Sequence, residues 1–237
     1  MDKNSYPKLR PTDDQRFEII GRGRYDFVRR AAAAADMQAA GDVESACNER
    51  FHAFQDIVAL LPEEEEVELR WEHDNTAAAI EILHDTAVDH FLLGDLEMAT
   101  AVLEMLLDVD PEDHTGSVCL LALCYAATQE WEAFDEISID LNDKLPAAVI
   151  ARLWAGWRRG GTLDGELLRL LQRNFKEYFA EFTADEHPAD EEYLRDISSA
   201  SPSRAAEARE LWLQTEPLWR EFSDFIEALQ AQKVSRG

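Results

Sequence analysis

The chain has 237 residues, of which 46% are hydrophobic, and it contains only 10 glycines and 8 prolines against a formal net charge of −26. The apolar content excludes a largely disordered chain, and the scarcity of Gly and Pro argues against an all-β fold with many tight turns. No run approaches the roughly 18 uncharged apolar residues of a membrane-spanning helix, and the first residues lack the apolar region of a secretory signal. The sequence therefore predicts a cytoplasmic, all-α protein that does not bind a membrane.

The negative charge is concentrated in the middle of the chain. Residues 31–143 hold 28 acidic residues against only Arg50 and Arg70. Such a segment repels a phosphate backbone, which excludes direct nucleic-acid binding there, and it is compatible with a basic protein partner. The alternative is that the acidity only keeps an outer face solvated. A basic cluster before this segment is expected to pair with its acids, although contact with nucleic acid or anionic lipid stays open, and it consists of Arg22, Arg24, Arg29 and Arg30.

In chain order, residues 1–26 are predicted to form an N-terminal segment with a short helix, in which residues 1–12 are loose. Residues 27–146 are predicted to form helical repeats, interrupted by the run from Pro62 to Glu66 that we interpret as a solvated helix start. Residues 147–232 are predicted to form a helical hairpin and capping helices, and 233–237 a loose tail. Within this last region we expect helices at 147–159, 164–182, 189–197, 203–214 and 217–232, two of them beginning close to a proline.

The middle of the chain repeats a short pattern. The segment from Leu93 to Ala99 aligns with the segment from Ala127 to Ala133, which places Gly94 on Thr128 at an offset of 34 residues. An upstream segment shows the same spacing between Gly41 and Ala46, at a distance of 53 residues from the next copy. A repeat of this length predicts stacked helical hairpins.

These residues resemble the tetratricopeptide-repeat (TPR) family. The middle repeat has small residues at Ala87 and Ala99, an aromatic at Phe91, Gly94 in the turn and Pro111 after the second helix. The next repeat keeps Ala122, Tyr125, Ala133 and Pro146, and the first keeps Ala34, Gly41 and Ala46. The whole chain also resembles bacterial TPR proteins to which no activity is attached. The resemblance implies an α-solenoid of antiparallel helix hairpins.

Residue patterns typical of catalysis are not found. The sequence has no glycine-rich phosphate loop, no GxSxG and no HExxH, and His84 and His90 are six residues apart where a zinc pair is usually four. The aspartates before Asp113 do not continue as a calcium loop. Cys47, Cys119 and Cys124 lack CxxC spacing and are predicted to be buried, reduced thiols. We expect no cofactor, no metal and no enzymatic activity, although an enzyme or regulatory subunit with an unrecognised site stays open.

In TPR proteins the first helix of each hairpin lines a concave groove. That register implies a partner-binding surface made of Glu81, His84, Val88, Phe91, Thr115, Val118, Ala122 and Tyr125, preceded by Val28, Ala31, Ala35 and Gln38. Acidic residues outside the groove are a second candidate contact, and they are Glu63, Glu64, Glu65 and Glu66.

We therefore expect a protein–protein interaction module, a TPR adaptor or chaperone-like binder of a protein that is basic or presents an amphipathic helix. Two alternatives stay open: a self-associating scaffold, and a groove filled by the chain's own C-terminal helix at Leu218–Leu229. Of Trp154, Trp157, Trp212 and Trp219, three are expected in the core. The sequence leaves the partner's identity and the oligomeric state undetermined.

Overall fold

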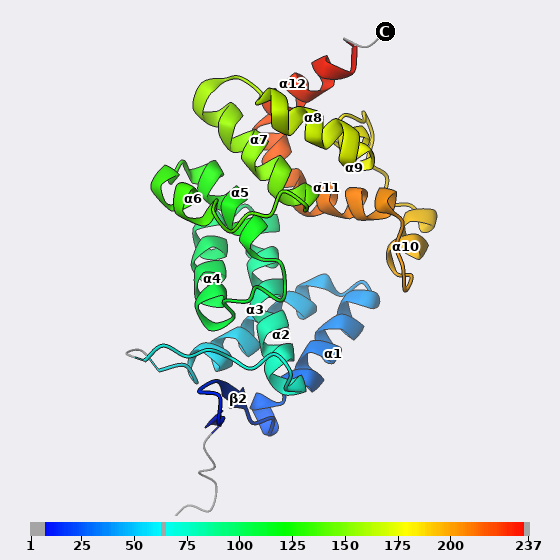
Figure 1. The fold of residues 1–237 in the computed structure, drawn as a ribbon. Coiled ribbons are helices and arrows are strands. Elements are labelled where there is room, and N and C mark those ends of the chain that lie inside the picture. The colour runs from blue at the N-terminus through cyan, green and yellow to red at the C-terminus, as the bar shows by residue number, and fades with distance from the viewer. Residues whose placement is uncertain (1–7, 63–64, 235–237) are drawn as a thin grey trace, which may run out of the picture. The chain divides into compact units, whose positions relative to one another are not determined.

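The computed structural model describes residues 8–62 and 65–234, and this part of the chain is mainly helical (Figure 1). It forms two compact units. The first contains the chain up to Phe91 together with Asp95–Leu121, and the second contains Leu92–Gly94 and the chain from Ala122 onward.

The first unit begins with the strands β1 (Leu9–Pro11) and β2 (Phe17–Ile19) and a short 3-10 helix at Gly23–Tyr25. The α-helices then follow in the order α1 (Phe27–Ala39), α2 (Val43–Val58), α3 (Asp74–Leu92), α4 (Leu96–Val109) and α5 (Val118–Thr128), of which the last crosses into the second unit. The second unit continues with α6 (Trp131–Ile137), α7 (Pro146–Gly160), α8 (Gly165–Asn174), α9 (Lys176–Phe182), α10 (Glu191–Ile197), α11 (Arg204–Glu221) and α12 (Ser223–Val234). The prediction of a mainly helical chain is confirmed.

Three helix-to-helix turns share one hydrogen-bond pattern. The bond runs from Asp42 N to Met37 O, from Asp95 N to His90 O and from Glu130 N to Tyr125 O, each at 2.9 Å. This is the 6→1 bond of the Schellman motif, which needs a left-handed residue just before the donor. Gly41 and Gly94 supply it with φ of +82° and +77°, and Gln129 supplies it with φ of +63°. The equivalent of Gly94 is therefore Gln129, and the predicted pairing with Thr128 is wrong by one residue.

The same shift changes which residue is buried after the turn. Ala46 and Ala99 lie four residues after the bond donors Asp42 and Asp95, and both are fully buried. The corresponding position after Glu130 is Phe134, which is also buried, whereas Ala133 is only half-buried. The third repeat therefore places an aromatic ring where the sequence pattern predicted a small residue.

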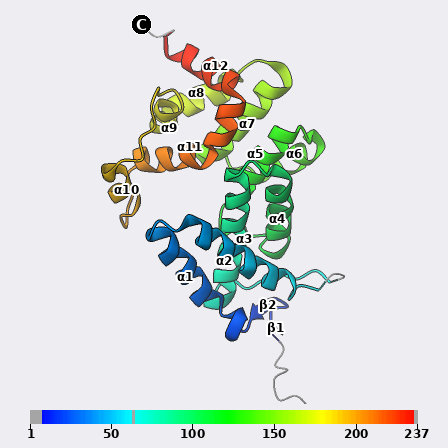
Figure 2. The same cartoon turned by 180° about the vertical axis from the view of Figure 1, so that it is seen from behind.

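The N-terminal strands were not predicted. β1 and β2 pair antiparallel, with Arg10 opposite Glu18. Phe17 then forms a parallel bridge with Leu69, and Leu69 N donates to Val109 O at 2.7 Å. Figure 2 shows this small sheet at one end of the first unit. Residues 9–11 are consequently ordered by pairing, which corrects the expectation of a loose segment for that part of 1–12.

Asn75 joins the N-terminal segment to α3. Its Nδ2 donates to the carbonyls of Ile19 (3.0 Å) and Tyr25 (2.9 Å), and its Oδ1 accepts from the backbone N–H of Phe27 (2.7 Å). A Cβ atom at Gly21 would lie 2.8 Å from the Asn75 side chain, so the chain approaches this amide as closely as only glycine permits. Val28 N also donates to Oδ1 (3.3 Å), so one buried side chain bonds backbone groups of four separate residues.

The core of the first unit is apolar and draws on every early element. The largest buried side chains include Ile19, Phe27, Ile57, Leu69, Ile80 and Leu83. α1 and α2 form an antiparallel hairpin, visible in both views (Figures 1 and 2). The predicted helix start at Pro62 is not seen in the described residues of that run, since Pro62, Glu65 and Glu66 are not helical and residues 68–70 bond to Phe17 and Val109. Glu63 and Glu64 lie outside the described residues.

The second unit is built around aromatic rings. Trp219 lies 5.2 Å from Trp154, 5.6 Å from Phe182 and 5.6 Å from Phe225, measured between ring centroids. Trp154, Trp212 and Trp219 are buried, and Trp157 is half-buried with its Nε1 donating to Asp224. The prediction that three of these four tryptophans lie in the core is confirmed.

Two predicted helix boundaries in this unit are wrong. Residues 164–182 form two helices, because the chain breaks at Phe175, with φ of −125° and ψ of 47°. Pro217 does not begin a helix but lies inside α11, which ends at Glu221. Trp212, Thr215, Leu218 and Trp219 are all buried, and burying this face outweighs the roughly 3 kcal/mol cost of an interior proline.

Candidate functional site

The α3 helix exposes part of the predicted groove lining. Glu81 is exposed, and His84 and Val88 are half-buried, whereas Phe91 is completely buried and is core. Asp85 lies on the same side of the helix, since positions 81, 84, 85 and 88 follow the i, i+3, i+4, i+7 spacing. We call the surface formed by Glu81, His84, Asp85 and Val88 the α3 face.

The predicted groove residues between positions 115 and 125 are also partly accessible and partly buried. Thr115 and Val118 are half-buried, whereas Ala122 and Tyr125 are buried and are excluded from contact with a partner in this conformation. The structure joins Thr115 to His84 through Ser117, a residue that sequence reasoning missed. Ser117 Oγ lies 2.8 Å from His84 Nδ1 and 2.7 Å from Thr115 Oγ1. Ser117 is fully buried, so its hydroxyl orients the imidazole and is not available as a nucleophile.

The carboxylates of the α3 face are partly desolvated although they are open to solvent. Burial among the surrounding atoms raises the pKa of Glu81, and the neighbouring Asp85 charge raises it further. Burial also raises the pKa of Asp85, and His84 and Arg50 lower it by less. The pKa of His84 is lowered by burial, which favours its neutral form. These carboxylates therefore reach water but keep protein atoms around them, which disfavours their ionised forms.

Among the described residues, Glu81 and Asp85 have no salt bridge, in contrast to the next carboxylate along the helix. Asp89 accepts from Arg50 through Nε at 2.7 Å and Nη2 at 2.8 Å, a bidentate pair between α2 and α3. Arg50 is 7% exposed and also donates to Gln38 Oε1 at 3.0 Å. The pair fixes α2 against α3, and it leaves Glu81 and Asp85 without a cation of their own.

The remaining predicted groove residues lie on α1. Val28 and Ala35 are exposed, Ala31 is half-buried, and Gln38 is used by Arg50. The expected pairing of the basic cluster is confirmed for Arg30, which contacts Glu49 (2.6 Å) and Asp56 (2.8 Å), and for Arg24, which contacts Asp56 at 3.4 Å. The Arg30 pairs join α1 to α2, and the Arg24 pair joins the N-terminal segment to α2.

A groove of about 1200 Å³ lies in the first unit between the C-terminal ends of α2 and α4. We call it the α2–α4 groove. Its apolar lining includes Val58, Leu61, Val67, Met105, Leu107 and Val109. The acidic side chains around it are Asp14, Glu65, Glu66, Glu68 and Asp108, and the lining contains one cation, Arg16. Glu65 and Glu66 are exposed, whereas Glu63 and Glu64 lie outside the described residues.

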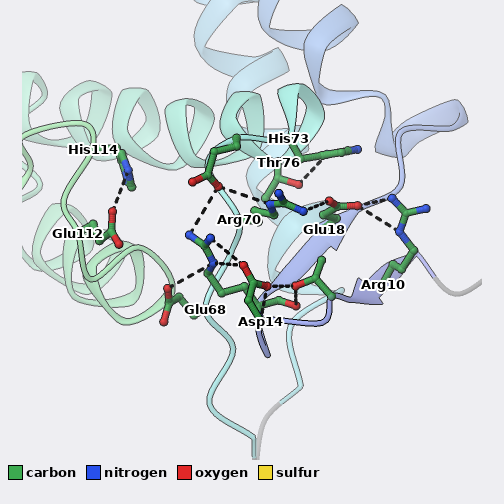
Figure 3. A network of polar contacts seen from close by, with 12 residues as sticks. Arg10, Asp14, Glu18, Glu68, Arg70, His73, Thr76, Glu112 and His114 are labelled. Carbon is green, nitrogen blue, oxygen red and sulfur yellow. Dashed lines mark hydrogen bonds and ion pairs between the residues drawn. The ribbon is translucent and has the colours of Figure 1, made fainter.

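A polar network supports one edge of this groove (Figure 3). Arg16 contacts Asp14 at 2.8 Å, Glu72 at 3.5 Å and Glu68 at 4.0 Å. Arg70 continues the network from Glu72 to Glu18, to which it lies 3.1 Å away, and Glu18 is also bound by Arg10. The Arg10 guanidinium holds the pKa of Glu18 below its usual range. The network ties the β-hairpin to residues 68–72 by charge as well as by backbone bonds.

In the acidic loop between α4 and α5, the aspartate carboxylates accept hydrogen bonds from the loop's own backbone. Asp110 accepts from the backbone N–H of His114 (2.9 Å), and Asp113 accepts from the backbone N–H of Ser117 (2.6 Å). The His114 ring stacks on Trp71 at 4.7 Å between centroids. Across the residues that the structure describes, no group of three His, Cys, Asp or Glu side chains could hold a metal ion. No described helix is both long and apolar enough to cross a membrane.

Comparison of the chain with models of protein families, with curated proteins and with solved structures found no match.

Proposed function

We propose that this chain is a TPR-type protein-interaction module that binds a basic protein partner at the α3 face. The observation that carries the proposal is the pair Glu81 and Asp85, which are exposed, partly desolvated and without a salt bridge among the described residues. Desolvation makes their ionised forms costly in the free protein, and a lysine or arginine of a partner relieves that cost.

Two further features support the assignment. The helical hairpins and the recurring left-handed turns at Gly41 and Gly94 agree with the resemblance to TPR proteins, in which such a surface holds a peptide or a helix. Excess negative charge also accelerates encounter with a basic protein, and half-buried Val88 adds an apolar contact beside the carboxylates. The proposal assigns no catalytic step to the chain.

The test is capture of partners by the full chain, eluted in salt steps and identified by mass spectrometry. The variant Glu81→Gln, Asp85→Asn removes both charges with almost no change of shape. The matched control is Glu132→Gln, Glu136→Gln on α6, where two exposed carboxylates have the same i, i+4 spacing.

We expect one or a few basic proteins that elute at moderate salt, remain with the α6 control and disappear with the α3 variant. If the α3 variant and the α6 control reduce capture equally, the chain attracts basic proteins only through its net charge. Capture that neither variant changes would remove the α3 face from the function.

A further inference from the structure

The α2–α4 groove is a cavity that the α3 face does not use, and its size suits a peptide. Its volume of about 1200 Å³ exceeds the 300–1000 Å³ typical of small-molecule pockets. Its floor keeps apolar surface in contact with water. Val58 is 40% exposed, and Leu61, Met105 and Leu107 are half-buried. Covering this floor with apolar side chains is favourable in proportion to the area removed from water.

The charges around the groove have one sign. Its single lining cation, Arg16, already has three carboxylate neighbours in Asp14, Glu68 and Glu72. Glu65, Glu66 and Asp108 are all exposed, and within the described part of the chain they form no salt bridge. An occupant with lysine or arginine along its edges would therefore find unpaired carboxylates there, whereas an acidic occupant would be repelled.

The backbone of the groove wall excludes strand addition. Phe17 pairs with Leu69 on one side, and Leu69 N donates to Val109 O on the other. The backbone at Leu69 is thus bonded on both sides within the chain, so an incoming strand finds no free edge there. The wall is also fixed by the ion pairs around Arg16 and Arg70 (Figure 3), which preform the groove before a partner arrives.

From these observations we infer that the α2–α4 groove is a docking site for a basic amphipathic helix of the protein partner. Apolar side chains at i, i+3, i+4 and i+7 of the bound helix lie on Val58, Leu61 and Leu107, and its lysines or arginines pair with Glu65, Glu66 and Asp108. The inference rests on the proposed function in one respect, since it takes the partner to be a basic protein. Beyond the proposed function, it assigns a second contact surface on this chain and an α-helical structure to the partner segment that binds there.

The experiment measures fluorescence anisotropy of a labelled peptide with the full chain. The probe is about 18 residues long, or five helical turns, with leucines on one face and lysines on the other. One control peptide has the same composition in an order that destroys the apolar face, and a second has glutamate in place of lysine. The protein variants are Glu65→Gln with Glu66→Gln at the rim, and Val58→Gln on the floor at an exposed helix end.

We expect the leucine–lysine probe to bind the wild-type chain, and the rim variant to weaken binding roughly tenfold because it removes two charge pairs. Val58→Gln should weaken binding as well, while Glu132→Gln with Glu136→Gln, which changes the net charge equally, should not. Three results would each overturn the inference. The reordered control peptide could bind as well as the probe, the α6 control variant could weaken binding as much as the rim variant, or the probe could fail to bind the wild-type chain.

The two proposals fail separately. Probe binding that is lost with Glu81→Gln, Asp85→Asn and kept with the groove variants would move the helix to the α3 face and overturn the groove. Probe binding in the groove together with partner capture that ignores Glu81 and Asp85 would keep the groove and reject the α3 face.

Discussion

The buried ion pair between Arg50 and Asp89 offers the sharpest test of how α2 and α3 are held together. The Arg50 and Asp89 side chains are 8% and 18% exposed, and the pair is bidentate. Removing one partner of a buried pair costs about 3–5 kcal/mol because the other charge is left unpaired. Since Asp89 keeps some contact with water, we expect Arg50→Met to lower the free energy of unfolding by about 3 kcal/mol. The double variant Arg50→Met, Asp89→Leu should recover most of this loss, so that its cost is well below the sum of the two single costs.

The measurement is urea unfolding of the wild type, both single variants and the double variant. Circular dichroism at 222 nm reports helix in both units. Tryptophan fluorescence mainly reports the second, because Trp71 is the one tryptophan of the first unit and the other five lie in the second. The loss should therefore be larger in circular dichroism than in fluorescence. Single losses below 1 kcal/mol that simply add in the double variant would refute the reasoning, since they would show that the pair is not coupled.

Three further predictions concern the carboxylates of the α3 face, one buried thiol and two glycines. The raised pKa values of Glu81 and Asp85 mean that their ionisation opposes folding, so Glu81→Gln, Asp85→Asn should stabilise the chain by roughly 0.5 kcal/mol at pH 7. That gain is absent at low pH, where both groups are protonated in either state. It grows as pH rises above the unfolded-state pKa and levels off above the raised folded-state pKa. Urea midpoints at pH 3 and 7 check it, and an equal gain at both would contradict it. Burial raises the pKa of the Cys119 thiol to about 11, so a thiol reagent at pH 8 should label Cys119 only when urea unfolds the chain. Gly156 lies inside α7 with open space where a Cβ would stand, so Gly156→Ala should stabilise by about 0.5–1 kcal/mol, whereas Gly161→Ala, at φ of +65°, should destabilise by a similar amount in thermal unfolding.

The sequence predicted the structure best at turns, where the conformation depends only on neighbouring residues. Gly41 and Gly94 form turns between helices as the repeat pattern predicted. The aspartate after each glycine caps the next helix, which was not predicted. The third turn was misaligned because Gln129 takes the left-handed conformation that glycine usually takes. The strands at Leu9–Pro11 and Phe17–Ile19 are too short for a periodic signal, and they depend on Leu69 and Val109 far along the chain.

The candidate site was predicted in part for a similar reason. The α3 helix is apolar on several sides, so its pattern does not say which side faces a partner. Glu81 and His84 proved accessible, while Phe91 proved to be core. Asp85 was overlooked because aspartate is common in this chain, and its role depends on Arg50 pairing with Asp89 instead. The α2–α4 groove depends on contacts between distant segments, which no local pattern encodes.

The bridge from Phe17 to Leu69 and on to Val109 has a consequence for synthesis on the ribosome. The chain emerges at about 5–20 residues per second, so β2 waits roughly 5–20 seconds for Val109 to follow it. During that interval Phe17 and Ile19 lack the partners that bury them, and the hairpin gains little from forming early because its long-range contacts are missing. The N-terminal strands therefore complete the first unit late, after the helices behind them have left the exit tunnel.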